Sequence, residues 1–230
     1  MNDDLKQQII AAGQQAGLFL NQDKMRQEQE ETPEDWPHQD WLLTRPLFFT
    51  LRPVDEYLRH YRGSWTQLGL GARPVGELGD DERGVGLVFE TRFSLAYVEG
   101  DSALDPGLVI DEILARLEDF THSYPAEATW LFADPLVWEM NIEGEIIYQL
   151  EESDTPLLDF GMYPTLGLNV WVYEAADEAA FEQSLAALGD DSALGRAIRD
   201  ALQRLALLFR WLDIEAPPRP PLLDFWGEDL

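Results

Sequence analysis

Residues 85–97 show the pattern that most restricts how this chain folds. The apolar members of this stretch are Val85, Leu87, Phe89, Phe93, Leu95 and Tyr97, and they alternate with Gly86, Glu90, Arg92 and Ser94. A period of two is typical of a β-strand that buries one face. Antiparallel sheets accept such strands, because only one face of the sheet has to be covered. The pattern therefore favours an antiparallel sheet with a cover on one side.

Other strands with the same alternation follow along the chain. They are predicted at residues 47–51, 136–142, 146–150 and 166–172, and a short strand at Thr129–Phe132 also fits. The two strands around residue 144 are separated by Glu143-Gly144, and glycine adopts the positive φ that a tight hairpin turn needs. We therefore expect a β-hairpin there.

Helices are predicted before and after these strands. One or two cover residues 3–31, one follows Pro53, one opens at Asp105-Pro106, and two cover residues 177–188 and 192–212. The helix after Pro106 has an apolar stripe of Ile110, Ile113, Leu114, Leu117 and Phe120. The last helix has one of Leu194, Ile198, Ala201, Leu205, Leu208 and Leu212, which predicts burial along its whole length. An Asp or Ser oxygen of residues 190–192 is expected to accept the free backbone N–H groups of its first turn.

The order of these elements predicts an α+β fold. We expect a mainly antiparallel sheet of about four to six strands with helices on one face, an N-terminal helical segment and a long C-terminal helix. Residues 1–215 are expected to form a single globular domain. An alternative is an N-terminal helical subdomain at residues 1–68, because residues 69–84 contain five glycines and a proline and are predicted to form a long irregular loop.

The composition excludes several classes of protein. The chain has 230 residues, no cysteine and a formal net charge of −28. Without cysteine it has no disulfide framework, no thiolate metal site and no thiol nucleophile. Such an acidic chain is also unsuited to binding nucleic-acid phosphates through broad positive charge, so direct nucleic-acid binding is not expected. The N-terminal residues resemble neither a secretory signal nor a transmembrane segment, so a cytoplasmic location without membrane binding is expected.

The negative charge is concentrated in the middle of the chain. Residues 74–191 hold 27 acidic residues and only three arginines. Two runs of acids stand out as candidate partner-binding residues: Glu77, Asp80, Asp81 and Glu82, and then Glu151, Glu152 and Asp154. A single-sign surface speeds encounter with a basic protein and complements it. An adaptation of the surface to high salt, as in halophiles, would explain the same charges without a partner.

The C-terminal tail combines two unusual features. Residues 216–221 read Ala-Pro-Pro-Arg-Pro-Pro, which predicts an extended polyproline segment. In residues 222–230, Phe225 and Trp226 are flanked by acidic residues and leucines. Either these aromatic residues bury themselves on their own molecule, or they form a docking motif for a partner. We include Phe225 and Trp226 among the candidate partner-binding residues.

Catalytic and metal sites have little support in the sequence. The three histidines, His38, His60 and His122, do not have metal-binding spacing, and neither acid run has the spacing of a calcium loop. We therefore predict no metal site, no catalytic residues and no cofactor. A carboxylate-based hydrolase remains an alternative, because two acids that are distant in sequence can meet in a fold.

These observations lead to one functional expectation. The chain is expected to be an acidic, non-enzymatic interaction protein that docks on a basic macromolecular partner, as an inhibitor, an immunity protein or a nucleic-acid mimic does. Besides the hydrolase, an assembly or secretion chaperone is an alternative, and it would expose an apolar groove. The oligomeric state does not follow from the sequence.

Overall fold

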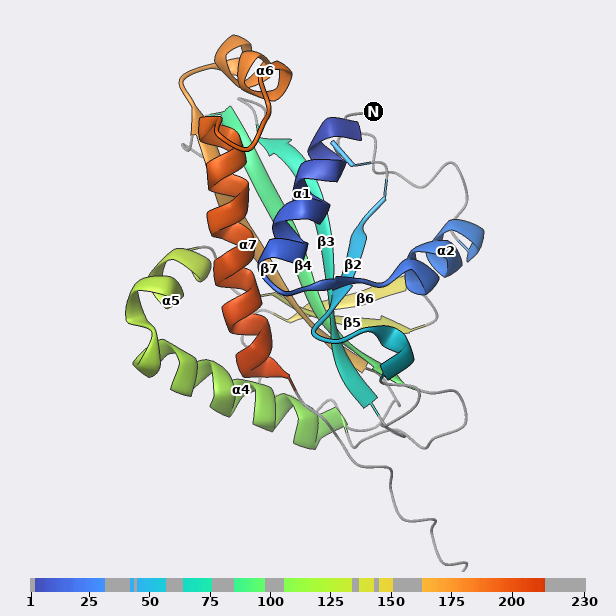
Figure 1. The fold of residues 1–230 in the computed structure, drawn as a ribbon. Coiled ribbons are helices and arrows are strands. Elements are labelled where there is room, and N and C mark those ends of the chain that lie inside the picture. Colours follow the sequence, from blue (N-terminus) through green and yellow to red (C-terminus); the bar gives the residue numbers. More distant parts are fainter. Residues whose placement is uncertain are drawn as a thin grey trace, which may run out of the picture.

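The protein is built on one antiparallel sheet (Figure 1). The computed structural model describes residues 3–31, 42–43, 45–56, 64–75, 85–97, 106–133, 137–142, 145–150 and 163–213. Within them the strands are β1 (Phe19–Leu20), β2 (Leu47–Thr50), β3 (Ser64–Val75), β4 (Val85–Tyr97), β5 (Val137–Ile142), β6 (Glu145–Leu150) and β7 (Tyr163–Ala175). Their order in the sheet is β1-β2-β3-β4-β7-β5-β6, and every neighbouring pair is antiparallel.

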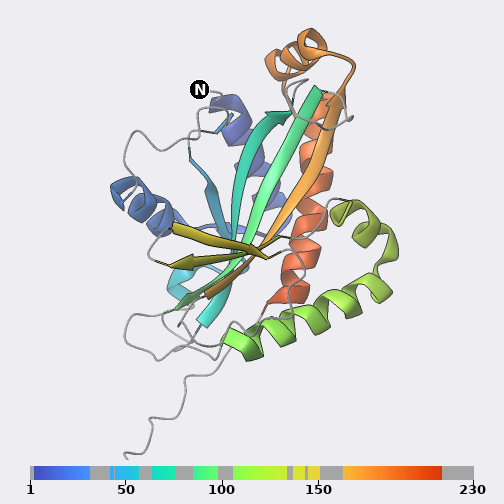
Figure 2. The ribbon, with the colours of Figure 1, turned by 180° about the vertical axis from the view of Figure 1, so that it is seen from behind.

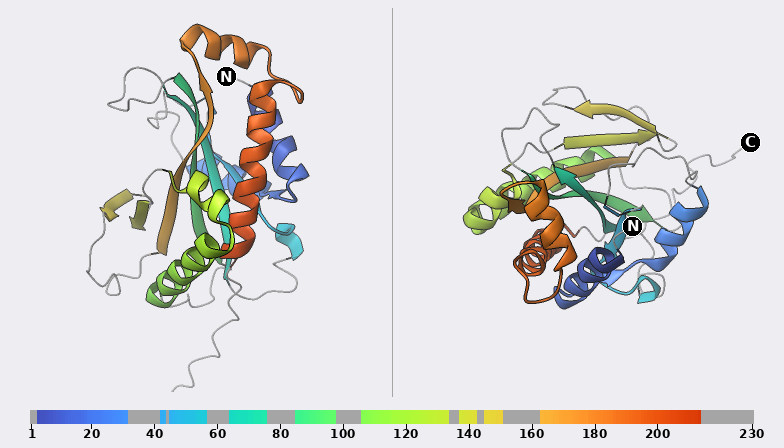
Figure 3. Two further views of the ribbon diagram at one scale, coloured as in Figure 1. Left: turned by 90° about the vertical axis from the view of Figure 1, so that its left-hand side faces the viewer. Right: turned by 90° about the horizontal axis from the view of Figure 1, so that it is seen from above.

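This sheet confirms the predicted α+β class. The described residues hold seven strands where four to six were expected, because neither the two-residue β1 at the edge nor β3 inside the sheet was predicted. The predicted hairpin is also confirmed, since β5 and β6 pair with each other. In Figures 2 and 3 this hairpin lies on the opposite side of the sheet from α1 and α7.

The described helices are α1 (Asp3–Gln15), α2 (Gln22–Glu31), α4 (Pro106–Ser123), α5 (Pro125–Leu131), α6 (Glu178–Ala186) and α7 (Ala193–Leu212). α1 and α7 cover the other face of the sheet, whereas α2 lies beside its edge at β2 (Figure 1). Figure 3 shows α1 and α7 side by side against the sheet. Val54–Glu56 form a helical turn where the helix after Pro53 was predicted, and residues 57–63 lie outside the described part.

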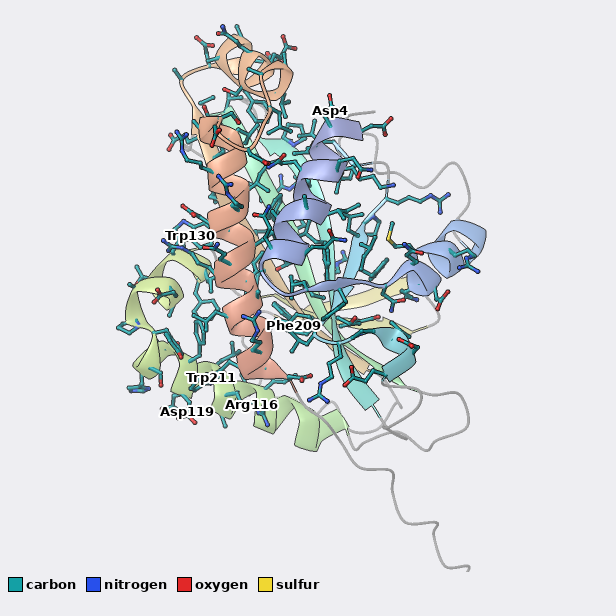
Figure 4. All side chains as sticks on the ribbon, in the orientation of Figure 1. Asp4, Arg116, Asp119, Trp130, Phe209 and Trp211 are labelled. Carbon is teal, nitrogen blue, oxygen red and sulfur yellow. The ribbon has the colours of Figure 1, made fainter. Side chains whose placement is uncertain are left out.

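Helix α7 is the central helix of this layer. All six residues of its predicted apolar stripe are buried, together with Leu202 and Phe209. Phe209 contacts Phe93 of β4 edge to face, with 5.7 Å between the ring centroids, and Figure 4 shows it pointing from α7 towards the sheet. A helix that is apolar on such a wide face contacts neighbours on two sides. In this fold the main neighbours are the sheet and α1, and α4 contacts the C-terminal end of α7 through Phe120 and Trp211.

Helix α1 lies close to both the sheet and α7. A Cβ atom at Gly13 would come within 2.8 Å of the Phe49 ring and 3.4 Å of Leu202, so only glycine permits this approach. The guanidinium group of Arg210 donates to the carbonyl oxygen of Ala16 at the end of α1. Gly17 follows with φ of +79°, which is the left-handed geometry typical of a helix C-terminus.

Two predictions for the segment 106–132 are wrong in detail. Leu114, predicted as part of the buried stripe of α4, is 46% exposed, while Ile113, Leu117 and Phe120 are buried. The predicted strand at Thr129–Phe132 is instead the end of α5. Pro125 fixes a helical φ at the first turn of this helix, and Ala128 and Leu131, three residues apart, then face the core.

The predicted loop at 69–84 is also wrong in its first half. Residues 69–75 belong to β3, and Leu68, Leu70 and Ala72 form its buried apolar face. The glycines belong to the strand because the opposite face needs space: a Cβ atom at Gly69 would come within 3.2 Å of the Phe48 ring. Residues 76–84 lie outside the described part of the chain.

The described part of the first 68 residues shares the sheet and the core with the rest of the described chain. β1 and β2 pair into the same sheet, and Leu5, Ile9 and Phe49 belong to the same buried cluster as Leu205. The proline-rich tail lies outside the described residues, which end at Asp213.

The fold predicts that the stripe of α7 is a main source of stability. Leu205→Ala removes a fully buried side chain and leaves a cavity between α7 and its neighbours, so the free energy of unfolding should fall by about 2 to 5 kcal/mol. Urea unfolding followed by circular dichroism measures this change. Gln203→Ala is the matched control, because Gln203 is exposed on the same helix and should change the stability by less than about 0.5 kcal/mol. Equal effects of the two substitutions would contradict the burial of this stripe.

Candidate docking surface

The candidate residues chosen from the sequence all lie outside the described part of the chain. They are Glu77, Asp80, Asp81, Glu82, Glu151, Glu152, Asp154, Phe225 and Trp226. Their role in binding a partner therefore stays a prediction. What the structure does describe is where the chain enters and leaves the first acid run. Val75 of β3 pairs with Gly86 of β4, and the neighbouring Val85 pairs with Ala175 at the end of β7. Both ends of the segment 76–84 therefore lie where β7 leads into α6.

Exposed carboxylates gather at this same end of the molecule. They come from the start of α1, the end of β7, α6 and the turn before α7, and we call them together the acidic end. Its members are Asp3, Asp4, Glu174, Asp177, Glu178, Glu182, Asp190 and Asp191, and all are exposed. Figure 1 shows α6 and the first turns of α1 and α7 at one end, and Figure 4 shows Asp4 there. The amide of Gln8 joins two of these segments by donating to the Asp190 carboxylate at 2.9 Å.

Some of these carboxylates also stabilise helices. The Asp177 side chain accepts a hydrogen bond from the Ala180 backbone N–H at 2.8 Å and so caps α6. Asp3 and Asp4 occupy the first turn of α1, where the helix dipole favours negative charge. Glu178 occupies the same position in α6. For these four residues a purely structural role is sufficient.

The turn before α7 is held by hydrogen bonds to its backbone. Of the Asp and Ser residues predicted to cap α7, it is Ser192 that does so: its hydroxyl accepts from Gly195 N–H at 3.0 Å and donates to the Gly189 carbonyl at 2.7 Å. Arg199 donates to the Asp190 carbonyl at 2.7 Å, and Arg196 donates to the carbonyl of Asp191. The two arginines therefore bind backbone oxygens and not the aspartate side chains of this turn, which fixes the position of Asp190 and Asp191.

Three carboxylates of the acidic end have no such structural explanation. Glu174, Glu182 and Asp191 make no side-chain hydrogen bond or ion pair with another described residue. The basic residues nearest in sequence to this end are Lys6, Arg196 and Arg199, against eight carboxylates, so its net charge is negative. A fixed group of exposed carboxylates with excess negative charge attracts cationic surfaces and loses this attraction as salt is added.

Acidic side chains occur on other surfaces as well. Glu118 and Asp119 are exposed on α4, and Figure 4 shows Asp119 at the end of the molecule away from α6. Asp23 on α2 is exposed but paired with Arg26 at 3.1 Å. The acidic end therefore differs from the other described surfaces in the number of carboxylates that it brings together, and not in being the sole place where they occur.

The described residues contain no group of three or more His, Cys, Asp or Glu side chains placed to hold a metal ion. No helix within the described ranges is long and apolar enough to cross a membrane.

Comparison with known proteins adds no relative. No family model matches the chain, and no curated protein or solved structure matches it either.

The sequence contained a weak signal for the acidic end. Its members come from four segments, 3–4, 174–178, 182 and 190–191, and none of these is as dense in acids as the runs near residues 80 and 152. A search for local runs therefore misses them. The usable signal was that the predicted helices at 3–31 and 177–188 both begin with acids, which places several carboxylates at helix N-termini.

The turn before α7 gives a sharp test of how the acidic end is positioned. A Cβ atom at Gly195 would overlap the carbonyl oxygen of Gly189, so Gly195→Ala should displace this turn and lower the free energy of unfolding by about 1 to 3 kcal/mol. Gly189→Ala is the matched control, because no atom lies within 4 Å of a Cβ at that position. Thermal unfolding measures both variants. The tight turn would be refuted by a Gly195→Ala protein as stable as the Gly189→Ala protein.

Proposed function

We propose that this is a non-enzymatic interaction protein that binds a basic macromolecular partner through its acidic surface. The observation that carries the proposal is the acidic end, where exposed carboxylates from α1, β7, α6 and the turn before α7 lie together. Inhibitors, immunity proteins and nucleic-acid mimics work in this way, because an array of fixed negative charges occupies a basic binding cleft. The proposal places the protein in the cytoplasm.

The physical basis is electrostatic steering and complementarity. The chain carries 44 acidic residues against 16 lysines and arginines, so a basic partner is attracted from a distance of about a Debye length, roughly 8 Å at physiological salt. At contact, carboxylates held in fixed positions lose less conformational freedom than mobile ones. The hydrogen bonds around Asp190 and Asp191 provide such fixed positions. A partner with lysine and arginine side chains in a concave surface fits this arrangement.

The acid runs predicted from sequence are part of the same proposal. Glu77, Asp80, Asp81 and Glu82 belong to the segment that begins and ends beside the acidic end, so they would add to its charge. Glu151, Glu152 and Asp154 would add a second acidic region. Phe225 and Trp226 are proposed as apolar contacts in one of the two interpretations of the tail.

The main competing explanation is that the acidity serves only solubility in salt. In that case it does not matter which carboxylates are removed, and neutralising any four exposed acids changes binding of a partner by the same amount. Docking at a defined surface requires that neutralising acids within that surface weaken binding more than neutralising acids elsewhere. Variants matched in charge but different in location therefore separate the two explanations.

We expect a partner to be captured at low salt and to be released by salt. The chain is immobilised and exposed to an extract of its native host, and the bound proteins are identified by mass spectrometry. Glu174→Gln, Glu182→Gln, Asp190→Asn and Asp191→Asn together should weaken binding of the captured protein by about tenfold or more, taking each exposed pair as worth up to about 1 kcal/mol. These substitutions leave the Asp177 cap of α6 in place.

The control variant carries the same change in charge at other surfaces. Asp23→Asn, Glu118→Gln, Asp119→Asn and Asp200→Asn neutralise four exposed acids outside the acidic end. Binding constants of both variants are measured at several salt concentrations against the purified partner. Equal weakening by the two variants would assign the effect to overall charge and refute a defined docking surface. Binding that does not depend on salt would refute electrostatic docking altogether.

A further inference from the structure

Helix α7 has an outward side that no other described helix or strand covers. Its residues Arg196, Asp200, Gln203, Leu207 and Arg210 are spaced three and four apart, so they lie in one row along the helix. Four of these side chains are exposed, and Leu207 is half-buried. Figure 1 shows α7 in front of the sheet, with α1 and α5 beside it and not across it. We call these five residues the outer row.

The charges of the outer row are not neutralised within the described part of the chain. Arg210 donates to the carbonyl oxygen of Ala16, and Arg196 donates to that of Asp191, so neither guanidinium group pairs with a described carboxylate. Asp200 makes no side-chain hydrogen bond or ion pair with another described residue. The row therefore presents a cation at Arg210 and an anion at Asp200, about 15 Å apart along the helix axis.

Apolar surface lies between and beside these two charges. Leu207 and Trp211 pack against the core but are only half-buried. Arg204 lies over the ring of Trp130 on α5, with its guanidinium carbon 4.9 Å from the ring centre. Figure 4 shows Trp130 and Trp211 on the same flank of α7. Polyproline segments bind to surfaces of this kind, which combine aromatic and apolar side chains, because an already extended segment loses little conformational freedom.

The chain contains a proline-rich segment that begins at this helix. Asp213 follows the last residue of α7 and has an extended backbone, with φ of −65° and ψ of 107°. It is followed by Ile214–Pro221, which includes four prolines. Because this segment is attached at the C-terminal end of α7, it runs back towards the N-terminal end when it docks on the helix. The attachment also gives it a high effective concentration at the outer row, which no separate molecule has.

The charges of this segment match those of the outer row in such an antiparallel arrangement. A polyproline segment rises by about 3.1 Å per residue and an α-helix by about 1.5 Å, so one residue of the segment passes about two residues of α7. Counted from Asp213, Glu215 then lies beside Arg210, and Arg219 lies beside Asp200. Each pair is opposite in charge. The two prolines between the pairs pass the apolar surface.

We propose that the outer row of α7 is the intramolecular docking surface for Ile214–Pro221, with Glu215 bound by Arg210, Arg219 bound by Asp200, and the prolines between them on the apolar surface. The proposal goes beyond the proposed function and does not rest on it, because no residue of the acidic end belongs to the outer row. Failure of either proposal therefore leaves the other unaffected.

Disulfide trapping in the full-length protein tests this arrangement. The chain has no cysteine, so Gln203→Cys and Pro218→Cys introduce its only thiols. The proposed register places Pro218 beside Gln203, and a disulfide forms when two Cα atoms come within about 7 Å. In a glutathione redox buffer this pair should close about tenfold faster, or more, than the pair Gln15→Cys and Pro218→Cys, as measured by mass spectrometry. Gln15 is the matched control, because it is exposed at the end of α1, next to the carbonyl group that Arg210 binds.

A charge exchange between the segment and the helix gives a second test. In the protein with cysteines at 203 and 218, Arg219→Glu should slow disulfide closure by about fivefold, because an attractive exposed pair becomes a repulsive one. Adding Asp200→Arg should restore the rate, which a protein that had lost its fold does not do. Asp119→Arg on α4 adds the same charge outside the outer row, so it should not restore the rate.

Three results would overturn the proposal. They are equal closure of the Gln203 and Gln15 pairs, closure that Arg219→Glu leaves unchanged, and equal rescue by Asp200→Arg and Asp119→Arg. Disulfides that join two copies in place of the intramolecular bond would assign the segment to a second molecule and would also overturn it.

Discussion

The burial of α7 between α1 and the sheet is the interaction on which the rest of the structure depends. Its apolar residues contact both neighbours at once, so the helix fixes the distance of α1 from the strands. Gly13 permits that distance, because any larger residue would meet Phe49 and Leu202. The same helix orients the turn that precedes it. Asp190 and Asp191 are therefore placed by a hydrophobic interaction that involves neither of them.

The arginines of this layer are used to bind the backbone. Arg210 binds a carbonyl at the end of α1, Arg199 binds the turn before α7, and Arg116 donates to the carbonyls of Trp211 and Asp213 at 3.1 and 2.9 Å. Cations near helix C-termini satisfy carbonyl groups that have no partner within the helix. In a chain with few cations, this use leaves carboxylates of the acidic end without an arginine partner among the described residues. The structural role of the arginines and the excess negative charge at the surface thus have one origin.

Much of the fold follows from periodicity in the sequence. The strand at Val85–Tyr97, the hairpin of β5 and β6 and the length of α7 were all predicted, because each has an apolar pattern of one clear period. The errors occur where two signals compete. In β3 the glycines indicated a loop, although Leu68, Leu70 and Ala72 already alternate, and the requirement for glycine comes from the Phe48 ring on a neighbouring strand. Such a contact between strands has no signature within the segment itself.

The candidate site was much harder to predict, for a related physical reason. Local density of acids identifies segments, whereas a docking surface is formed by residues that the fold brings to one place. Glu174 and Asp190 are 16 residues apart, and Asp4 is distant from both, yet the end of β7, the turn before α7 and the start of α1 meet because α1 and α7 lie side by side. The sheet shows the same limit, since Arg92 and Gly167 become neighbours only through the register of β4 with β7. Both arrangements depend on pairings between distant parts of the chain, so they become visible only once the order of the strands and the position of α7 are known.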